Sequence, residues 1–192
     1  MRTAALTTVI AAAALAAAAC TSKQPGQPSP SSGQSAGSGA SSSPSSGAAN
    51  GLAGLNACSL LTDDEAKQVV PGVNPPIDQG ELGGTGTSNC QWNKSVTNGA
   101  GGVAFSITVR PAQGLEDVNP NGGQTTKTTS NAGRQVVLLT NSGSGISCIA
   151  AVAVGSGRVD IEARTLRGAT TEEMCTIVEK TDGFVEPKLP AS

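Results

Sequence analysis

The chain has 192 residues, the length of one ordinary domain with appendages. All fourteen acidic residues lie beyond Cys58, and with ten basic residues they give residues 52–192 a net charge of −4. A mildly acidic domain without a run of Lys and Arg lacks the basic surface that nucleic-acid binding requires, so we expect no nucleic-acid partner.

The N-terminal nineteen residues have the pattern of an export signal. Arg2 supplies a positive end, and the apolar run that follows is shorter than the roughly 20 residues of a membrane span. Cys20 comes directly after small residues, as in the bacterial lipobox, although Ala17 stands where Leu or Val is usual. We expect residues 1–19 to be a signal peptide. An ordinary secretory signal cut after Ala19 and an uncleaved anchor helix are the alternatives.

The cysteine count supports the lipobox interpretation. The chain has five cysteines, and an odd thiol is a liability in an exported protein. If Cys20 carries a diacylglyceryl lipid of the palmitate kind, the other four can pair. Two acyl chains suffice for stable anchoring, so we expect a lipoprotein on the outer, extracytoplasmic face of the cell membrane.

Residues 21–51 consist mainly of Ser, Gly, Pro, Gln and Ala, with no apolar periodicity before Leu52. Such a segment cannot bury enough apolar surface to order itself. We expect lipidated Cys20 and a disordered linker over residues 20–51, followed by a single extracytoplasmic domain over residues 52–192.

The domain should begin with a short helix. Thr62 and Glu65 have the spacing of a capping box, and Pro71-Gly72 should stop the helix after about Val70.

Five segments have the alternation or the continuous apolar character of strands. They are residues 88–94, 103–110, 135–139, 146–154 and 158–164. Cys90 and Trp92 share one face of the first segment, and we expect Trp92 to lie in the core. A long polar loop is expected over about 111–133.

A second capping box, at Thr170 and Glu173, opens the last helix, and Asp182-Gly183 should end it. Short connections between most strands favour antiparallel pairing. We therefore expect an α+β fold, with an antiparallel sheet of about five strands and an N-terminal and a C-terminal helix covering one face.

Four cysteines remain for disulfides, and spacing alone does not choose among three connectivities. Their positions on the expected elements favour Cys58–Cys90 and Cys148–Cys175, because each pair would join a helix to the sheet. Zinc ligation is the alternative, but close-spaced Cys pairs and histidine are lacking.

The run Cys58-Ser-Leu-Leu-Thr-Asp-Asp-Glu-Ala66, followed farther along by Cys90-x-Trp92, resembles an uncharacterised domain family of small actinobacterial cell-envelope lipoproteins. Ala132-Gly133-Arg134, Cys148 and Cys175 continue the likeness, which covers roughly residues 55–185. The resemblance implies an envelope lipoprotein with paired cysteines and no assigned activity. The layout also looks like the extracellular sensor domains of some actinobacterial receptor kinases, a likeness that implies ligand or partner binding.

The absence of histidine excludes Ser-His-Asp and Cys-His catalysis, and no P-loop or nucleophile elbow occurs. We expect no catalytic residues, no metal and no cofactor. The remaining carboxylates have ordinary explanations: capping, a solvated strand face, or a polar loop whose spacing does not follow the EF-hand pattern. They are Asp63, Asp64, Glu65, Glu172 and Glu173 at helix starts, Asp160 and Glu162 on a strand, and Glu116 and Asp117 in the loop.

These observations favour a non-catalytic binding, sensor or accessory module of the cell envelope, whose partner is an envelope protein or a small ligand. The alternatives are a hydrolase that uses carboxylates alone and a structural spacer. A cleft with two carboxylates about 5–9 Å apart would favour the hydrolase.

Overall fold

The computed structural model describes residues 51–95, 102–165 and 168–191. The expected signal peptide, the lipid site at Cys20 and the expected linker up to residue 50 lie outside these residues. In the described part of the chain, no helix is both long and apolar enough to cross a membrane.

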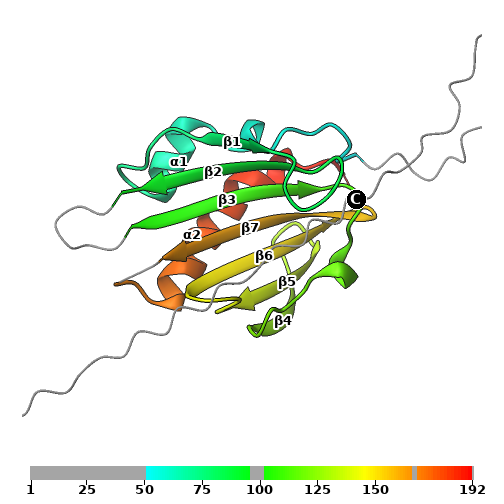
Figure 1. Ribbon diagram of the computed structural model, residues 1–192. Coiled ribbons are helices and arrows are strands. Elements are labelled where there is room, and N and C mark those ends of the chain that lie inside the picture. Colours follow the sequence, from blue (N-terminus) through cyan, green and yellow to red (C-terminus); the bar gives the residue numbers. More distant parts are fainter. Residues whose placement is uncertain (1–50, 96–101, 166–167, 192) are drawn as a thin grey trace, which may run out of the picture. The chain divides into compact units, whose positions relative to one another are not determined.

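The described residues form a seven-stranded antiparallel sheet in the order β1-β2-β3-β7-β6-β5-β4 (Figure 1). The strands are β1 (Ile77–Gly80), β2 (Ser88–Lys94), β3 (Val103–Arg110), β4 (Gln124–Thr129), β5 (Gln135–Thr140), β6 (Ile146–Val154) and β7 (Gly157–Thr165). Strand β7 is therefore central, and β1 and β4 are the two edges.

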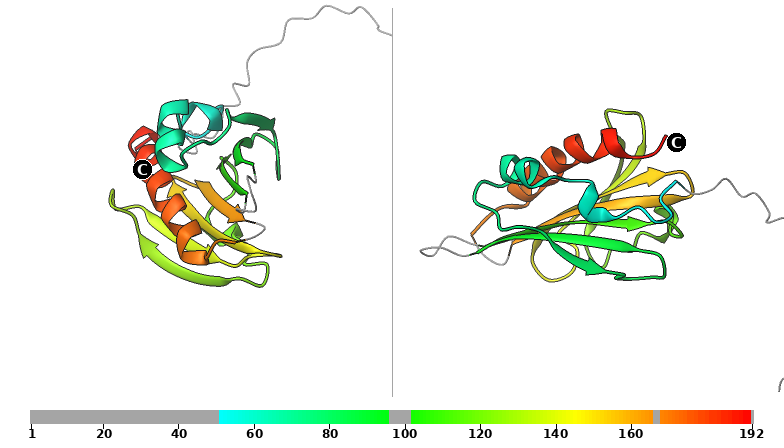
Figure 2. Two further views of the ribbon diagram at one scale, coloured as in Figure 1. Left: turned by 90° about the vertical axis from the view of Figure 1, so that its left-hand side faces the viewer. Right: turned by 90° about the horizontal axis from the view of Figure 1, so that it is seen from above.

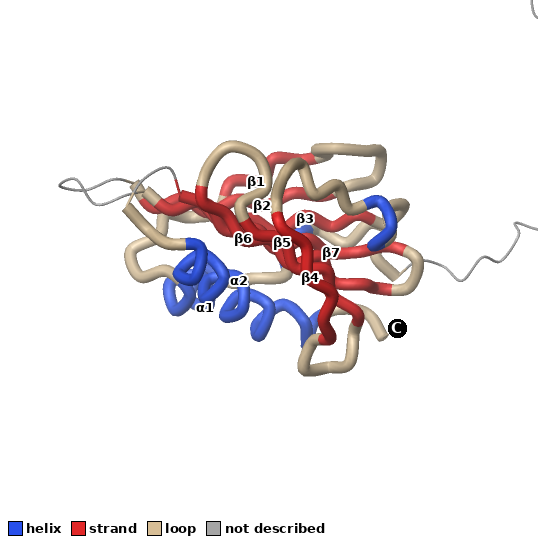
Figure 3. Tube along the Cα trace, turned by 90° about the horizontal axis from the view of Figure 1, so that it is seen from below, coloured by secondary structure: helices blue, strands red, loops and turns tan. Residues whose placement is uncertain are grey.

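Two α-helices accompany the sheet in the described part of the chain, α1 (Asp63–Val69) and α2 (Thr171–Val185). Both lie on the same side of the sheet (Figure 3). Three short 3-10 helices complete the domain: η1 (Ala57–Ser59), η2 (Leu115–Asp117) and η3 (Glu186–Lys188). Both expected capping boxes are present, at Thr62 with Glu65 and at Thr170 with Glu173.

The main core lies between α2 and strands β6 and β7, where α2 runs across the sheet (Figure 2). The apolar stripe of α2, with Met174 and Val178, is buried there. Trp92 is fully buried, as expected, and its ring stacks on Phe105 at 5.2 Å between centroids.

The expectation that the N-terminal helix itself covers the sheet is wrong. Helix α1 packs against α2, and the N-terminal element that contacts β2 and β3 is η1. Leu60 and Leu61, between η1 and α1, are buried in the core. The capping box placed the helix correctly, but its seven residues have only Ala66 and Val69 buried, which is too small an apolar face to cover a sheet.

The expected number of strands was also wrong, because β1 and β4 were not anticipated. All residues of both strands are exposed, so neither shows the apolar alternation that indicates a half-buried strand. Strand β4 pairs with β5 from Gln124 to Thr129 through its backbone, and this hairpin occupies part of the expected polar loop.

The C-terminal helix continues beyond its expected end. Asp182-Gly183 lies inside α2, which reaches Val185. Val185 is fully buried, so continuing the helix adds apolar burial that outweighs the helix-breaking tendency of Gly183, about 1 kcal/mol relative to alanine.

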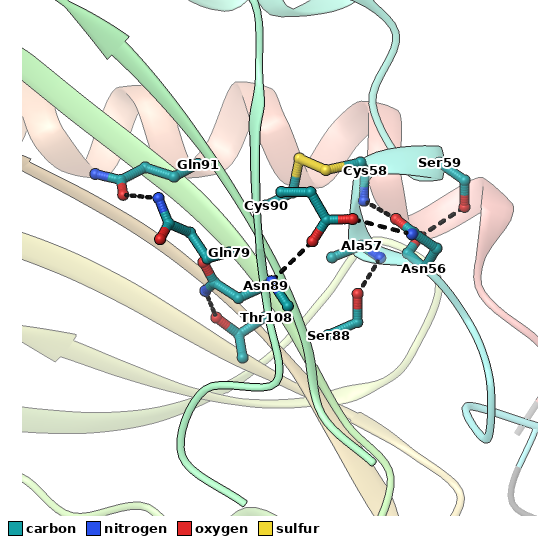
Figure 4. The surroundings of a disulfide bond; sticks show 12 residues. Asn56, Ala57, Cys58, Ser59, Gln79, Ser88, Asn89, Cys90, Gln91 and Thr108 are labelled. Atoms are coloured by element: carbon teal, nitrogen blue, oxygen red, sulfur yellow. Dashed lines mark hydrogen bonds between the residues drawn. A yellow bond between two sulfur atoms is a disulfide. The ribbon is translucent and has the colours of Figure 1, made fainter. Parts of the chain in front are cut away.

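Two disulfides are present, at the pairs that the element positions favoured: Cys58–Cys90 and Cys148–Cys175. The first joins η1 to β2, and the Asn56 side chain caps η1 beside it by accepting the Cys58 N–H at 2.7 Å (Figure 4). The second joins β6 to α2. Cys90 and Cys148, the partners on the strands, are fully buried.

Candidate ligand-binding groove

The sheet face opposite α2 carries most of the polar side chains of the strands. The antiparallel register aligns them in rows that cross β2, β3, β7 and β6. One row contains Asn93, Ala104, Arg164 and Ser147, and the next contains Gln91, Ser106, Glu162 and Ile149. Polar residues that are distant in sequence are thereby gathered on one surface.

A cavity of about 1000 Å³ lies over these two rows at one end of the sheet. Its floor includes Gln91, Asn93, Ile149, Glu162 and Arg164, and its walls include Lys94 and the loop of residues 142–145. Ligand pockets commonly span about 300–1,000 Å³, so a small molecule or a short chain segment fits this volume.

The loop that forms one wall is held by its own hydrogen bonds. Gly143 has a φ of 73°, a backbone conformation that glycine adopts without strain, and its N–H donates to the Asn121 carbonyl at 3.0 Å. Ser142 donates its hydroxyl to the Pro120 carbonyl at 2.9 Å. The wall is therefore joined to the segment between η2 and β4.

A second cavity of about 320 Å³ lies farther along the same face. Beside it, Asp160 is held between two guanidinium groups: Arg110 donates to one carboxylate oxygen at 2.5 Å and Arg158 to the other at 2.8 Å. Arg158 also donates to the Gly114 carbonyl at 2.6 Å, which ties the loop before η2 to β7.

Helix η2 covers the β5 side of this face. Leu115 and Val118 pack there on a small apolar cluster of Val137, Leu139 and Ala151. On β2, β3 and β7, the outward side chains at the Lys94 end stay partly or fully exposed, namely Gln91, Asn93, Glu162 and Arg164. Farther along the same strands, Asn89, Thr108 and Arg158 are buried.

The two cavities adjoin, because Ile149 and Glu162 line both. Together they form one groove, which we call the sheet groove. It runs from the Lys94 end of β2 to the Arg110 end of β3.

The acidic residues considered in the sequence lie mostly where capping accounts for them. Asp63, Asp64 and Glu65 are in the first turn of α1, and Glu172 and Glu173 are in the first turn of α2. The Lys188 ammonium, 2.6 Å from Glu65, and the Thr62 N–H hold the pKa of Glu65 below its usual value. None of these five residues lines the sheet groove.

The loop and strand carboxylates do reach the sheet groove. Asp117 lines the second cavity and accepts the Gly114 N–H at 2.9 Å, while Glu116 starts η2 beside it. Glu162 lies on the floor. We expected Asp160 and Glu162 to lie on a solvated strand face. The Glu162 side chain is 34 % exposed, in line with this expectation. The Asp160 side chain is only 14 % exposed, because two arginines enclose it.

A separate charged cluster joins the end of α2 to the β4–β5 hairpin. Glu186 accepts a hydrogen bond from the Ser130 hydroxyl and lies 3.9 Å from Arg134, which donates to the Pro190 carbonyl at 2.7 Å. Burial, together with the nearby Glu186 charge, raises the pKa of Asp182 to about 6, and Arg134 opposes the shift. Asp182 and Glu186 line neither cavity, so this cluster belongs to the packing of α2.

Three carboxylates line the second cavity, Asp117, Asp160 and Glu162, and Asp160 is fully engaged. Both Asp160 oxygens accept from arginines, which leaves this carboxylate poorly placed to take a proton from a ligand. Within the described ranges, no group of three or more Cys, Asp or Glu side chains is placed to hold a metal ion.

Most of the groove was not anticipated from the sequence. Gln91, Asn93, Ser147 and Arg164 carry no motif, and their outward positions in alternating strands are the signal that marks them. Which part of that face stays open depends on where η2 lies, and local spacing does not determine this.

A comparison with models of known protein families identifies the family of the chain. A family model described as "Protein of unknown function (DUF3558)" matches residues 15–188. The chain belongs to the DUF3558 family. The matched residues of this DUF3558 chain contain both disulfides and every residue that lines the sheet groove. The searches of curated proteins and of solved structures found no match.

Proposed function

We propose that this DUF3558 chain is a non-catalytic binding module of the cell envelope, anchored to the outer face of the membrane by lipid on Cys20. The sheet groove is its binding site. The observation that carries the proposal is the adjoining pair of cavities on the sheet face opposite α2, lined by residues from five strands and three connecting segments. A passive spacer would have no use for an open polar surface of this size.

The disulfides support the lipid anchor indirectly. Cys58, Cys90, Cys148 and Cys175 pair with one another, which accounts for four of the five cysteines of the chain and leaves Cys20. The small residues before Cys20 and the apolar run of the N-terminus give that cysteine the context of a lipobox. Disulfides also suit an oxidising compartment outside the cytoplasm.

The anchor is tested by Cys20→Ser in the full-length chain. We expect the variant to be released from the membrane fraction or to remain unprocessed, while the natural chain sediments with membranes. Mass spectrometry of the mature natural chain should find a lipid-modified N-terminal cysteine. Membrane retention of the variant at mature size would contradict the anchor.

The binding site is tested by photo-crosslinking in cells. A photoreactive phenylalanine derivative replaces Asn93 on the groove floor or, as the matched control, Thr126 on the exposed edge strand β4. We expect position 93 to give a reproducible adduct whose added mass identifies a small ligand or a protein, and position 126 to give none. If neither position gives a reproducible adduct, or both give the same ones, the groove is not the binding site.

A further inference from the structure

The tip of the β4–β5 hairpin is attached to the rest of the domain through polar groups. Over residues 124–135, every residue is exposed except Ser130 and Arg134. Ser130 donates its hydroxyl to the Glu186 carboxylate, and Arg134 donates to the Pro190 carbonyl. Because no apolar side chain of this tip is buried, its attachment to the C-terminal end of α2 depends on these polar and charged contacts.

Two carboxylates share one guanidinium at this contact. Asp182 on α2 and Glu186 at its C-cap are one helical turn apart, and Arg134 lies 3.9 Å from Glu186. The side chains of Arg134 and Glu186 are only 9 % and 7 % exposed. One carboxylate oxygen of Asp182 is buried and accepts no hydrogen bond from the described residues. When Asp182 is ionised, the contact therefore has one negative charge in excess.

We propose that this cluster acts as a pH-sensitive latch between the β4–β5 hairpin and the end of α2. The hairpin latch, as we call it, consists of Ser130, Arg134, Asp182 and Glu186. It holds the hairpin tip when Asp182 is protonated, and ionisation of Asp182 loosens it. The inference goes beyond the proposed binding function and does not depend on it, because no residue of the latch lines the sheet groove.

The surroundings of Asp182 set the direction of the switch. Burial raises the pKa of Asp182 from its ordinary 3.8 to about 6, the Glu186 charge adds to this rise, and the Arg134 charge opposes it. In the described part of the chain, these are the two charges that act on this carboxyl. Release of the hairpin lets water reach Asp182, so its pKa falls back toward the ordinary value.

The closed latch therefore binds a proton more tightly than the open one. The extra stability of the closed form is fully present below about pH 4 and is lost as the pH rises through about 6. If opening returns the pKa of Asp182 to 3.8, the equilibrium constant for opening rises about tenfold between pH 5 and pH 7. Incomplete release lowers this factor, which is therefore an upper limit.

The other edge of the sheet provides an internal reference. Strand β1 also has no buried residue, and it lies at the opposite edge from β4. Its side-chain hydrogen bonds come from uncharged donors: Asn56 donates to Asp78, and Gln79 donates to Gln91. Local opening of β1 should therefore not follow the ionisation of Asp182.

The test is hydrogen exchange by NMR on the ¹⁵N-labelled full-length chain in detergent micelles, at pH 5 and pH 7. Each rate is divided by the intrinsic exchange rate at the same pH. The Ser130 N–H donates to the Arg134 carbonyl at 2.9 Å, so the alternate residues Thr128 and Thr126 also bond to β5. We expect the protection of these three amides to fall several-fold, and by about tenfold at most, from pH 5 to pH 7. The protected amides of β1 should not change.

Variants then assign the effect to Asp182. In Asp182→Asn, the protection at pH 7 should rise to that of the natural chain at pH 5 and should differ by less than about twofold between the two pH values. Glu179→Gln is the matched control, because it removes a carboxylate from the exposed side of the same helix. This control should keep the pH dependence of the natural chain.

A second measurement is the ¹³C titration of the Asp182 carboxyl group, whose midpoint should be about 6. A midpoint near 3.8 would overturn the latch, and so would hairpin protection that is the same at pH 5 and pH 7. An equal pH dependence in Asp182→Asn and the natural chain would assign the effect to another group and would also overturn it. These outcomes do not affect the crosslinks from position 93, which test the sheet groove separately.

Discussion

At the scale of single residues, Asp160 is more important for the stability of the fold than its place on an outward strand face suggests. It neutralises Arg158, whose side chain is 8 % exposed, and Arg110, and through Arg158 it fixes the loop at Gly114. A charge this buried is costly to leave without its partner, because the surrounding protein replaces water poorly as a solvent for ions.

The first prediction is that Asp160→Asn lowers the free energy of unfolding by about 3 kcal/mol, since it leaves two neighbouring guanidinium groups without their carboxylate. Glu162→Gln is the matched control: it lies two residues away on the same face but is more exposed, and it should cost less than about 0.5 kcal/mol. Urea unfolding measures both. Equal losses in the two variants would show that the arginine clamp has no stabilising role.

Asp182 makes the second residue-scale prediction. Its folded-state pKa of about 6 lies above its ordinary value of 3.8, so folding favours the protonated form. The stability that this group contributes is fully present below about pH 4 and is lost as the pH rises through about 6. Asp182→Asn, which mimics the protonated carboxyl, should therefore stabilise the domain at pH 7, on the order of 1 kcal/mol after solvent screening, and hardly at pH 4.

The measurement is the difference in unfolding free energy between Asp182→Asn and the natural chain at each pH. Glu65 contributes in the opposite direction, because its lowered pKa means that the stability it adds is lost as the pH falls. Both proteins contain Glu65, so its contribution cancels in the difference. Glu179→Gln, on the exposed side of the same helix, is the control and should show no such trend. A stabilisation by Asp182→Asn that is the same at pH 4 and pH 7 would contradict the raised pKa.

At the scale of elements, the sequence pattern predicted the strands that bury apolar side chains and missed the strands that do not. The five expected strands all bury residues on at least one face, whereas β1 and β4 bury none. Backbone pairing and, at β1, exposed side-chain hydrogen bonds hold these edges, and neither leaves an apolar period in the sequence. The prediction that α2 ends at Gly183 failed for a related reason. Burial of Val185, which is a tertiary effect, decides where α2 ends.

The disulfides give a prediction about elements. The cysteines of Cys58–Cys90 are separated by 32 residues and those of Cys148–Cys175 by 27. The chain-entropy model therefore predicts nearly equal stabilisation from the two disulfides. Replacing both cysteines of either pair with alanine should lower the free energy of unfolding by about 3–4 kcal/mol, measured by urea unfolding. A loss several times larger for one pair would mean that its contribution is not mainly an effect on the unfolded chain.

At the scale of the whole molecule, the order of the strands predicts the order of local opening. Strands β3, β7 and β6 are paired on both sides, while β1 and β4 each have one neighbour and no buried residue. Hydrogen exchange should therefore be fastest in β1 and β4 and slowest in β7 and its two neighbours. Protection of β4 equal to that of β7 would show that something covers this edge in solution.

The sheet groove is a property of the whole molecule, which explains why the sequence revealed little of it. Asn93, Arg164 and Ser147 come from three strands and meet only because the register places them in one row. The two disulfide pairings were easier to anticipate, because each depends on one helical segment and one strand. Sites that depend on several strand registers at once are not visible in local spacing.

The closeness of the two ends of the described chain has a consequence for orientation. Gly51 lies against Pro190, so near that an added Cβ would come within 2.7 Å of the proline ring. Arg134 binds the Pro190 carbonyl and the Ala153 carbonyl, at the end of the sheet opposite the Lys94 mouth of the groove. Gly51 and Pro190 therefore lie together at one end of the sheet, and the larger cavity lies at the other end.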